Sequence, residues 1–155
     1  MRLPRTRRPA LCRLLLPMLL LAMAMASPAG AQQRPHTPPR GSPERQALMD
    51  ALRETVGREL GKPVIFHVHQ LRVLGDWAFV DVSPLQPDGS PFDFRGTPME
   101  KAWREGFVDD FTYAVLRRQG GRWRVVRHAI GPTDVAWMAW EEELRLPRAL
   151  FPYPN

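Results

Sequence analysis

A stripe of apolar residues at fourfold spacing is the first regular pattern in the chain after its N-terminal segment. Its members are Leu48, Leu52, Val56 and Leu60. The spacing predicts an α-helix with one buried face, because residues four apart lie above one another on a helix. Ser42 can accept hydrogen bonds from the free amides of the first turn, and Pro43 and Glu44 suit that turn. Gly61 and Pro63 end the helix.

The next pattern is an alternation of apolar and polar residues that predicts a β-hairpin. Residues 64–74 are rich in β-branched and aromatic side chains, and residues 77–82 resume this composition. Gly75-Asp76 between them is a signal for a two-residue turn. The alternation breaks at Gln70-Leu71, which predicts a β-bulge there.

A second hairpin is predicted further along the chain, after a loop over residues 83–96. Thr97-Pro98-Met99-Glu100 has the spacing of a capping box and predicts a short helix that reaches about Glu105. Residues 111–118 and 122–130 then form two strands, with Gly120-Gly121 as their turn.

The C-terminal part of the chain predicts a final helix. Gly131-Pro132 ends the preceding strand, because proline has no amide for the strand ladder. Thr133 or Asp134 can cap the helix, and Pro147 ends it. Three large apolar side chains share one of its faces: Trp137, Trp140 and Leu144.

This order of elements predicts an α+β fold. The N-terminal helix packs on an antiparallel sheet of two hairpins, and the short C-terminal helix completes the domain, because each element has an apolar face to cover. Of the five tryptophans after the leader, most are expected in the core, and Trp103, which lies among charged residues, is expected at the surface.

The strand sequences also carry a resemblance. Gly121-Arg122-Trp123-Arg124-Val125, after an N-terminal helix, is similar to a late strand of the cystatin-like and NTF2-like folds. Residues 75–80, 121–126 and 131–135 resemble a group of small secreted bacterial proteins of unknown function. The resemblance implies a helix on a curved sheet and brings no known activity.

Residues 1–31 are predicted to be a secretory signal peptide. Arginines precede an apolar stretch over residues 14–25, and Ala29-Gly30-Ala31 is a cleavage pattern, so the mature chain would start at Gln32. The apolar stretch is shorter than the roughly 20 residues of a membrane anchor. Arg7-Arg8 resembles a twin-arginine signal, but the following Pro9 and the leucine-rich core favour the general secretory route. Either route predicts a periplasmic or secreted protein.

Residues 32–43 are predicted to be a proline-rich linker, extended and solvated, in which His36 is an ordinary linker residue. Residues 44–155 then form a single domain with one core. The only cysteine, Cys12, lies in the leader, which excludes disulfides, a thiolate nucleophile and a lipid-anchored cysteine in the mature chain.

The charge of the chain argues against nucleic acid as a partner. The sequence has 22 Lys+Arg and 16 Asp+Glu, but five of the arginines and none of the acidic residues lie in residues 1–31. The rest therefore carries 17 basic and 16 acidic residues and is nearly neutral. A nucleic-acid-binding domain is usually strongly basic.

His67 and His69 are the most distinctive candidates for chemistry. Side chains two apart on a strand point the same way, so both imidazoles can reach one metal ion. A site needs a third ligand, which His128 or Asp81 on neighbouring strands would supply. The alternative is a pair of surface histidines with no ligand, and this alternative is preferred, so no metal or other cofactor is expected.

Two acidic sites have structural alternatives as well. Asp134 can be a general base at the mouth of a pocket, as in isomerases of the NTF2-like fold, or a helix cap, which is preferred. Asp109-Asp110 cannot readily form a carboxylate pair, because neighbouring residues at a strand end point to opposite faces, so a role in a turn or at the strand end is preferred.

Nucleotide-binding, zinc-protease and serine-hydrolase motifs are absent from the sequence. The leading hypothesis is therefore a non-catalytic binding or accessory module at the bacterial cell envelope, with a protein or envelope ligand as its partner. The alternatives are a small pocket enzyme of the isomerase or hydratase kind, using His67, His69, His128 or Asp134, and a periplasmic metal binder through His67 and His69. A filled core favours the binding module, and an apolar pocket with one of those groups at its floor favours the enzyme.

Overall fold

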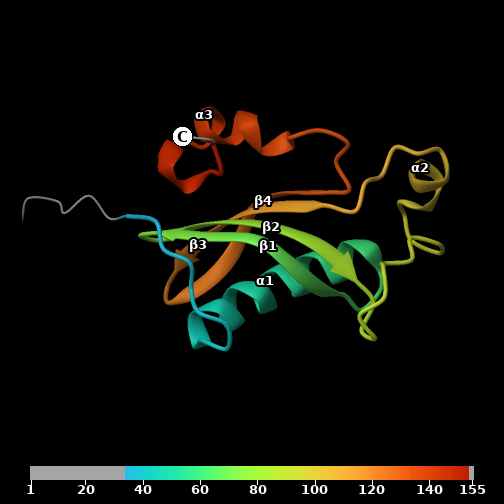
Figure 1. Ribbon diagram of the computed structural model, residues 1–155, viewed down its shortest axis with the longest axis horizontal. Coiled ribbons are helices and arrows are strands. Elements are labelled where there is room, and N and C mark those ends of the chain that lie inside the picture. Colours follow the sequence, from blue (N-terminus) through green and yellow to red (C-terminus); the bar gives the residue numbers. More distant parts are fainter. Residues whose placement is uncertain (1–33, 154–155) are drawn as a thin grey trace, which may run out of the picture. The chain divides into compact units, whose positions relative to one another are not determined.

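The computed structural model describes residues 34–153, which form one α+β domain (Figure 1). The predicted signal peptide lies outside the described residues. The elements in chain order are α1 (Pro43–Leu60), β1 (Ile65–Leu74), β2 (Trp77–Leu85), α2 (Glu100–Arg104), β3 (Thr112–Gln119), β4 (Arg122–Ile130), the 3₁₀ turn η1 (Ala136–Ala139), α3 (Trp140–Glu143) and the 3₁₀ turn η2 (Arg148–Leu150). Within this range no helix combines the length and hydrophobicity needed to cross a membrane.

Helix α1 has the ends that the sequence predicts. The Oγ of Ser42 accepts a hydrogen bond from the amide of Arg45 at 3.2 Å, and Pro43 occupies the first turn. Gly61 ends the helix with a left-handed backbone, φ 68°. The apolar stripe is buried, and Met49 joins it. The cap therefore defines where the helix begins, and the buried apolar stripe defines which face packs on the domain.

Replacing Ser42 with alanine is expected to lower the free energy of unfolding by about 0.5 to 2 kcal/mol, because the Arg45 amide loses its acceptor. Thermal unfolding measures the loss. Thr133→Ala serves as the control and is expected to change stability by less than about 0.5 kcal/mol, because Thr133 is exposed and caps no helix. Equal losses in the two variants would contradict a stabilising role for the cap.

The sheet is antiparallel throughout, with the strand order β1-β2-β3-β4. Both predicted hairpins are present, and their turns are Gly75-Asp76 and Gly120-Gly121. The bulge in β1 lies at His69, just before the predicted Gln70-Leu71, since Val68 pairs with Val82 and Gln70 with Asp81.

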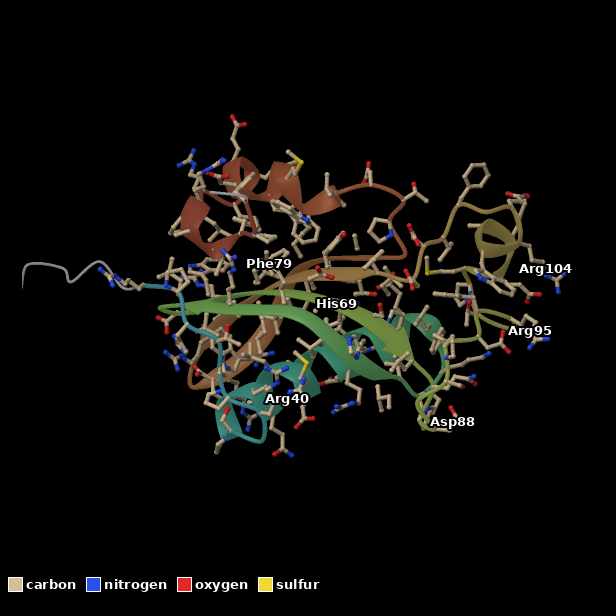
Figure 2. The ribbon with its side chains drawn as sticks, viewed as in Figure 1. Arg40, His69, Phe79, Asp88, Arg95 and Arg104 are labelled. Atoms are coloured by element: carbon tan, nitrogen blue, oxygen red, sulfur yellow. The ribbon has the colours of Figure 1, made fainter. Side chains whose placement is uncertain are left out.

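Each face of the sheet packs against a different part of the chain (Figure 1). On one face, α1 covers Ala78, Val80 and Val82 of β2 together with parts of the neighbouring strands, and apolar side chains fill the space between them. On the other face, the segment from η1 to η2 covers Phe79, whose side chain is fully buried (Figure 2). Strand β2 therefore contributes apolar side chains to the packing on both faces of the sheet.

The C-terminal segment differs from the predicted single helix. The chain forms η1 and then the short α3, and η1 begins after Val135, which makes no side-chain capping bond. The prediction that Thr133 or Asp134 caps a helix is wrong, since both side chains are exposed and the helical turns start further on. The expectation that most of the tryptophans lie in the core is confirmed for Trp137 and Trp140, because both are buried against the sheet.

Part of the proline-rich segment lies against the domain. His36 pairs with Val73 at the edge of β1 through two backbone hydrogen bonds of 2.9 and 2.8 Å. The hydroxyl of Thr37 donates to the carbonyl of Leu71, and Pro38 is buried. This part of the segment therefore packs on the edge of β1, whereas the prediction was a solvated linker. His36 has a structural role, because its ring also bonds Glu44 at 3.0 Å.

Candidate functional site

A cleft of about 580 Å³ opens at the end of the sheet where β1 begins and β2 ends. Its apolar wall comes from the end of β2, the loop over residues 85–96, α2 and the segment before β3, and consists of Pro84, Leu85, Pro91, Phe92, Phe94, Trp103 and Val108. Its polar groups are His67, Ser83, Asp109 and Asp110. This volume and this mixture of apolar wall and few polar groups are typical of ligand sites.

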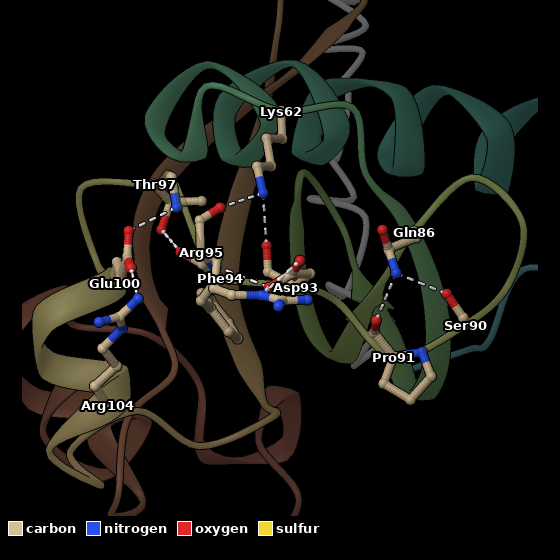
Figure 3. Close-up of polar contacts among 11 residues, drawn as sticks. Lys62, Gln86, Ser90, Pro91, Asp93, Phe94, Arg95, Thr97, Glu100 and Arg104 are labelled. Atoms are coloured by element: carbon tan, nitrogen blue, oxygen red, sulfur yellow. Dashed lines mark hydrogen bonds and ion pairs between the residues drawn. The ribbon is translucent and has the colours of Figure 1, made fainter.

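The loop that forms one wall of the cleft is held by Lys62, just after α1 (Figure 3). The Nζ of Lys62 donates to the carbonyls of Asp93 and Arg95, the former at 3.0 Å. The Arg95 side chain in turn bonds the carboxylate of Asp93 and lowers the pKa of that carboxyl to about 2. Phe94 between them points inward and is buried, with its ring 5.0 Å from that of Phe92. These hydrogen bonds and the buried ring of Phe94 hold the loop in place as one wall of the cleft.

Helix α2 places Trp103 at the cleft. The hydroxyl of Thr97 accepts from the amide of Met99. It also donates to the carbonyl of Phe94, and the carboxylate of Glu100 accepts from the amide of Gly96 at 2.8 Å (Figure 3). The side chains of the predicted capping box therefore do make local backbone bonds, but the helix begins at Glu100, later than predicted. Trp103 is 36% exposed, as expected for a surface residue.

His67 and His69 lie side by side, with ring centroids 4.9 Å apart. Both are on the sheet face opposite α1, and His67 lines the cleft. The Nε2 of His69 lies 2.8 Å from the Oγ of Ser83, which is only 9% exposed and also lines the cleft. His69 thus lies behind Ser83, and its ring also contacts Phe111.

Asp81 lies in β2 on the same face as Ser83, two residues away. Burial raises the pKa of the Asp81 carboxyl, and the charge of nearby His69 partly opposes this effect. Gln70 is directly opposite Asp81 in the register. The Oε1 of Gln70 and the Oδ1 of Asp81 are buried and find no hydrogen-bond donor in the described part of the chain. A buried carboxylate oxygen that accepts no hydrogen bond disfavours the ionised form of the carboxyl.

Asp81→Asn is therefore expected to stabilise the protein at pH 7. A carboxyl whose pKa is higher in the folded state contributes stability below its unfolded pKa of about 3.9, and that stability is lost as the pH rises through the folded pKa. The gain should vanish near pH 3, where Asp81 is protonated in both states. Denaturant unfolding at the two pH values measures it, and Glu105→Gln, at an exposed carboxylate, is the control. A loss of stability at pH 7 would contradict the prediction.

Asp109 and Asp110 form the negative rim of the cleft. The amide of Asp109 donates to the carbonyl of Gly131 at 3.0 Å, and the Oδ1 of Asp109 accepts from the amide of Asp110 at 2.9 Å. These bonds are the expected turn role, but both residues also line the cleft, which the sequence did not indicate. Burial, together with the charges of Asp81, Asp109 and Asp134, raises the pKa of Tyr113.

Two of the predicted site residues lie elsewhere. His128 is on the face that α1 covers, where its Nε2 lies 2.6 Å from the carboxylate of Glu59. It therefore cannot join His67 and His69. Asp134 is exposed and does not line the cleft. Between Arg34 and Tyr153, no group of three His, Cys, Asp or Glu side chains is placed to hold a metal ion.

Ser83, Phe92 and Phe94 are site residues that the sequence analysis missed. Residues 83–96 were predicted to be a loop. The two phenylalanines of Phe92-x-Phe94 are nevertheless a signal in the sequence that this part of the loop is buried. The pairing of Ser83 with His69 had no such signal, because it depends on the register between β1 and β2.

Comparison of the chain with protein-family models, with curated proteins and with solved structures finds no match.

Proposed function

We propose that this protein is an exported, non-catalytic binding module of the bacterial cell envelope, and that its ligand occupies the cleft. The observation that carries the proposal is the cleft itself, with aromatic and aliphatic walls and a few polar groups. The filled interior between α1 and the sheet favours a binding module over an enzyme with a deep internal pocket. The helix followed by an antiparallel sheet also supports a cystatin-like or NTF2-like fold.

Export is the first part of this proposal to test. Cleavage after Ala31 would give a mature chain that starts at Gln32 and has no membrane anchor. The intact mass of the protein in periplasmic and medium fractions measures the cleavage site. A membrane-retained species that still carries residues 1–31 would contradict export as a free domain.

Ligand binding is the second part. The exported protein, labelled with ¹⁵N, is titrated with a library of short peptides and envelope metabolites, and ligands are expected to shift the signals of Trp103, Val108 and Ser83. Trp103→Ala should weaken binding, whereas Phe107→Ala, at a 68% exposed residue outside the cleft lining, should not. Ligands recovered unchanged support a non-catalytic role. Shifts confined to other surfaces would contradict the cleft as the binding site.

A small pocket enzyme of the isomerase or hydratase kind is the second candidate, and the 2.8 Å contact between His69 and Ser83 favours it. A histidine at hydrogen-bond distance from a hydroxyl in a cleft is an arrangement used in general acid–base catalysis. The candidate now depends on His67 and His69, because His128 and Asp134 lie away from the cleft. Conversion of a library compound that stops in His69→Gln would establish it, and such conversion would overturn the non-catalytic proposal.

A further inference from the structure

We propose that the cleft recognises the arginine side chain of a short peptide segment of a partner protein. This inference depends on the cleft being the ligand site proposed above. Three features of the cleft indicate the chemistry of its ligand: the rim carboxylates without an ion pair, the partly exposed ring of Trp103, and nearby positive side chains that already have partners.

The carboxylates of Asp109 and Asp110 are exposed at the rim, and neither forms an ion pair with another residue in the range 34–153. Within this same range, one of their oxygens, Oδ1 of Asp109, accepts a backbone hydrogen bond, from the amide of Asp110. The remaining oxygens can accept the N–H groups of a guanidinium, whose planar fork of five donors matches carboxylates. The rim therefore offers acceptors for a cation that the domain itself does not supply.

Three of the positive side chains around the cleft wall already have partners. Lys62 donates to two loop carbonyls, Arg95 bonds Asp93, and Arg104 pairs with Glu100 at 2.5 Å. These side chains hold the wall in place (Figure 3). An incoming cation would thus meet the rim carboxylates without having to displace an internal one.

Trp103 supplies the aromatic part of the site. Three other aromatic rings carry an arginine over their faces, at 5.0 Å for Trp77, 5.3 Å for Trp123 and 3.6 Å for Tyr153. Within the described residues Trp103 has no such cation, although it is partly exposed and lies beside the rim. Guanidinium groups stack on aromatic faces and bind carboxylates at the same time, which an ammonium does less well.

The apolar wall of the cleft favours a ligand that carries an apolar group in addition to its positive charge. Phe92, Phe94 and Val108 leave room for an apolar group next to the cation, since the cleft volume of about 580 Å³ is in the range of sites that hold drug-sized ligands. A peptide with an aromatic residue beside its arginine satisfies both parts of the cleft. We therefore expect a dipeptide of this kind to be the smallest ligand that binds measurably.

Three matched peptides test the inference: acetyl-Phe-Arg-amide, its neutral isostere with citrulline in place of arginine, and acetyl-Phe-Glu-amide. Calorimetry with the exported protein is expected to show binding of the arginine peptide, binding at least about tenfold weaker for the citrulline peptide, and none for the glutamate peptide. Raising the salt concentration from 50 to 500 mM should weaken only the arginine peptide, because screening acts on the charge.

The double variant Asp109→Asn/Asp110→Asn keeps the oxygen that accepts the Asp110 amide and removes both charges. It is expected to lower the affinity for the arginine peptide about tenfold, to the level of the citrulline peptide. Asp134→Asn is the control, since it removes an exposed carboxylate that does not line the cleft, and it should change the affinity less than about twofold.

The outcomes separate this inference from the proposed function. Equal binding of the arginine and citrulline peptides, or binding of a different library ligand in the cleft without binding of the arginine peptide, would overturn the inference and leave the binding module intact. Absence of any ligand-induced shift at cleft residues across the peptides and the library would overturn both.

Discussion

Replacing Trp137 with alanine is expected to lower the free energy of unfolding by about 3 to 5 kcal/mol, one of the largest losses for a single substitution in this domain. Trp137 is only 8% exposed. Its ring stacks on Phe151 with centroids 5.9 Å apart and meets Phe79 edge-on at 5.8 Å. Because Phe79 belongs to the central strand β2, removing Trp137 uncovers the face of the sheet opposite α1. The melting temperature should fall by roughly 10 to 20 °C.

Met138 is the control, because it is the next residue in η1 and is 52% exposed. Met138→Ala should change the free energy of unfolding by less than about 0.5 kcal/mol. Hydrogen exchange adds a second measurement, since the amides of β2 and β3 should lose protection in Trp137→Ala and keep it in Met138→Ala. Similar melting temperatures for the two variants would show that the C-terminal segment does not stabilise the sheet.

Features determined by a few neighbouring residues could be predicted from the sequence. Ser42 and Gly61 delimit α1, and Gly75-Asp76 is the turn of the first hairpin. In each case the required backbone angles or the capping acceptor come from the residues at that position. The neighbouring placement of His67 and His69 was predicted as well, although the bulge at His69 was expected slightly later in the strand.

Features determined by distant parts of the chain could not be predicted in the same way. Asp134 looked like a helix cap, but η1 begins only after Val135, in the segment that places Trp137 against Phe79. His36 looked like a linker residue, but the edge of β1 offers its backbone two hydrogen bonds at Val73. The cleft itself combines residues from the beginning of β1, from the end of β2 and from the segment before β3. Such combinations depend on register and packing, which no local pattern specifies.

Gly131 connects the end of β4 to this cleft. Its amide donates to the carbonyl of Phe111 at 2.7 Å, and its carbonyl accepts from the amide of Asp109 at 3.0 Å. Its backbone has φ 64°, a conformation that a residue with a Cβ rarely adopts. A Cβ at this position would overlap the Cγ1 of Val108 and lie 3.2 Å from the carbonyl oxygen of Asp109. Both of these neighbours belong to the cleft lining.

Gly131→Ala is therefore expected to lower the free energy of unfolding by about 2 to 4 kcal/mol, the sum of a left-handed backbone and an overpacked contact. Gly121→Ala separates the two causes, because Gly121 has φ 76° but no atom within 4 Å of its Cβ position. That control should lose only about 1 to 2 kcal/mol. Because the overlap in Gly131→Ala displaces Val108 and Asp109, it should also weaken ligand binding in the cleft, whereas Gly121→Ala should leave binding unchanged. Equal stability losses and equal affinities in the two variants would mean that the segment before β3 yields freely and that Gly131 does not hold the cleft in shape.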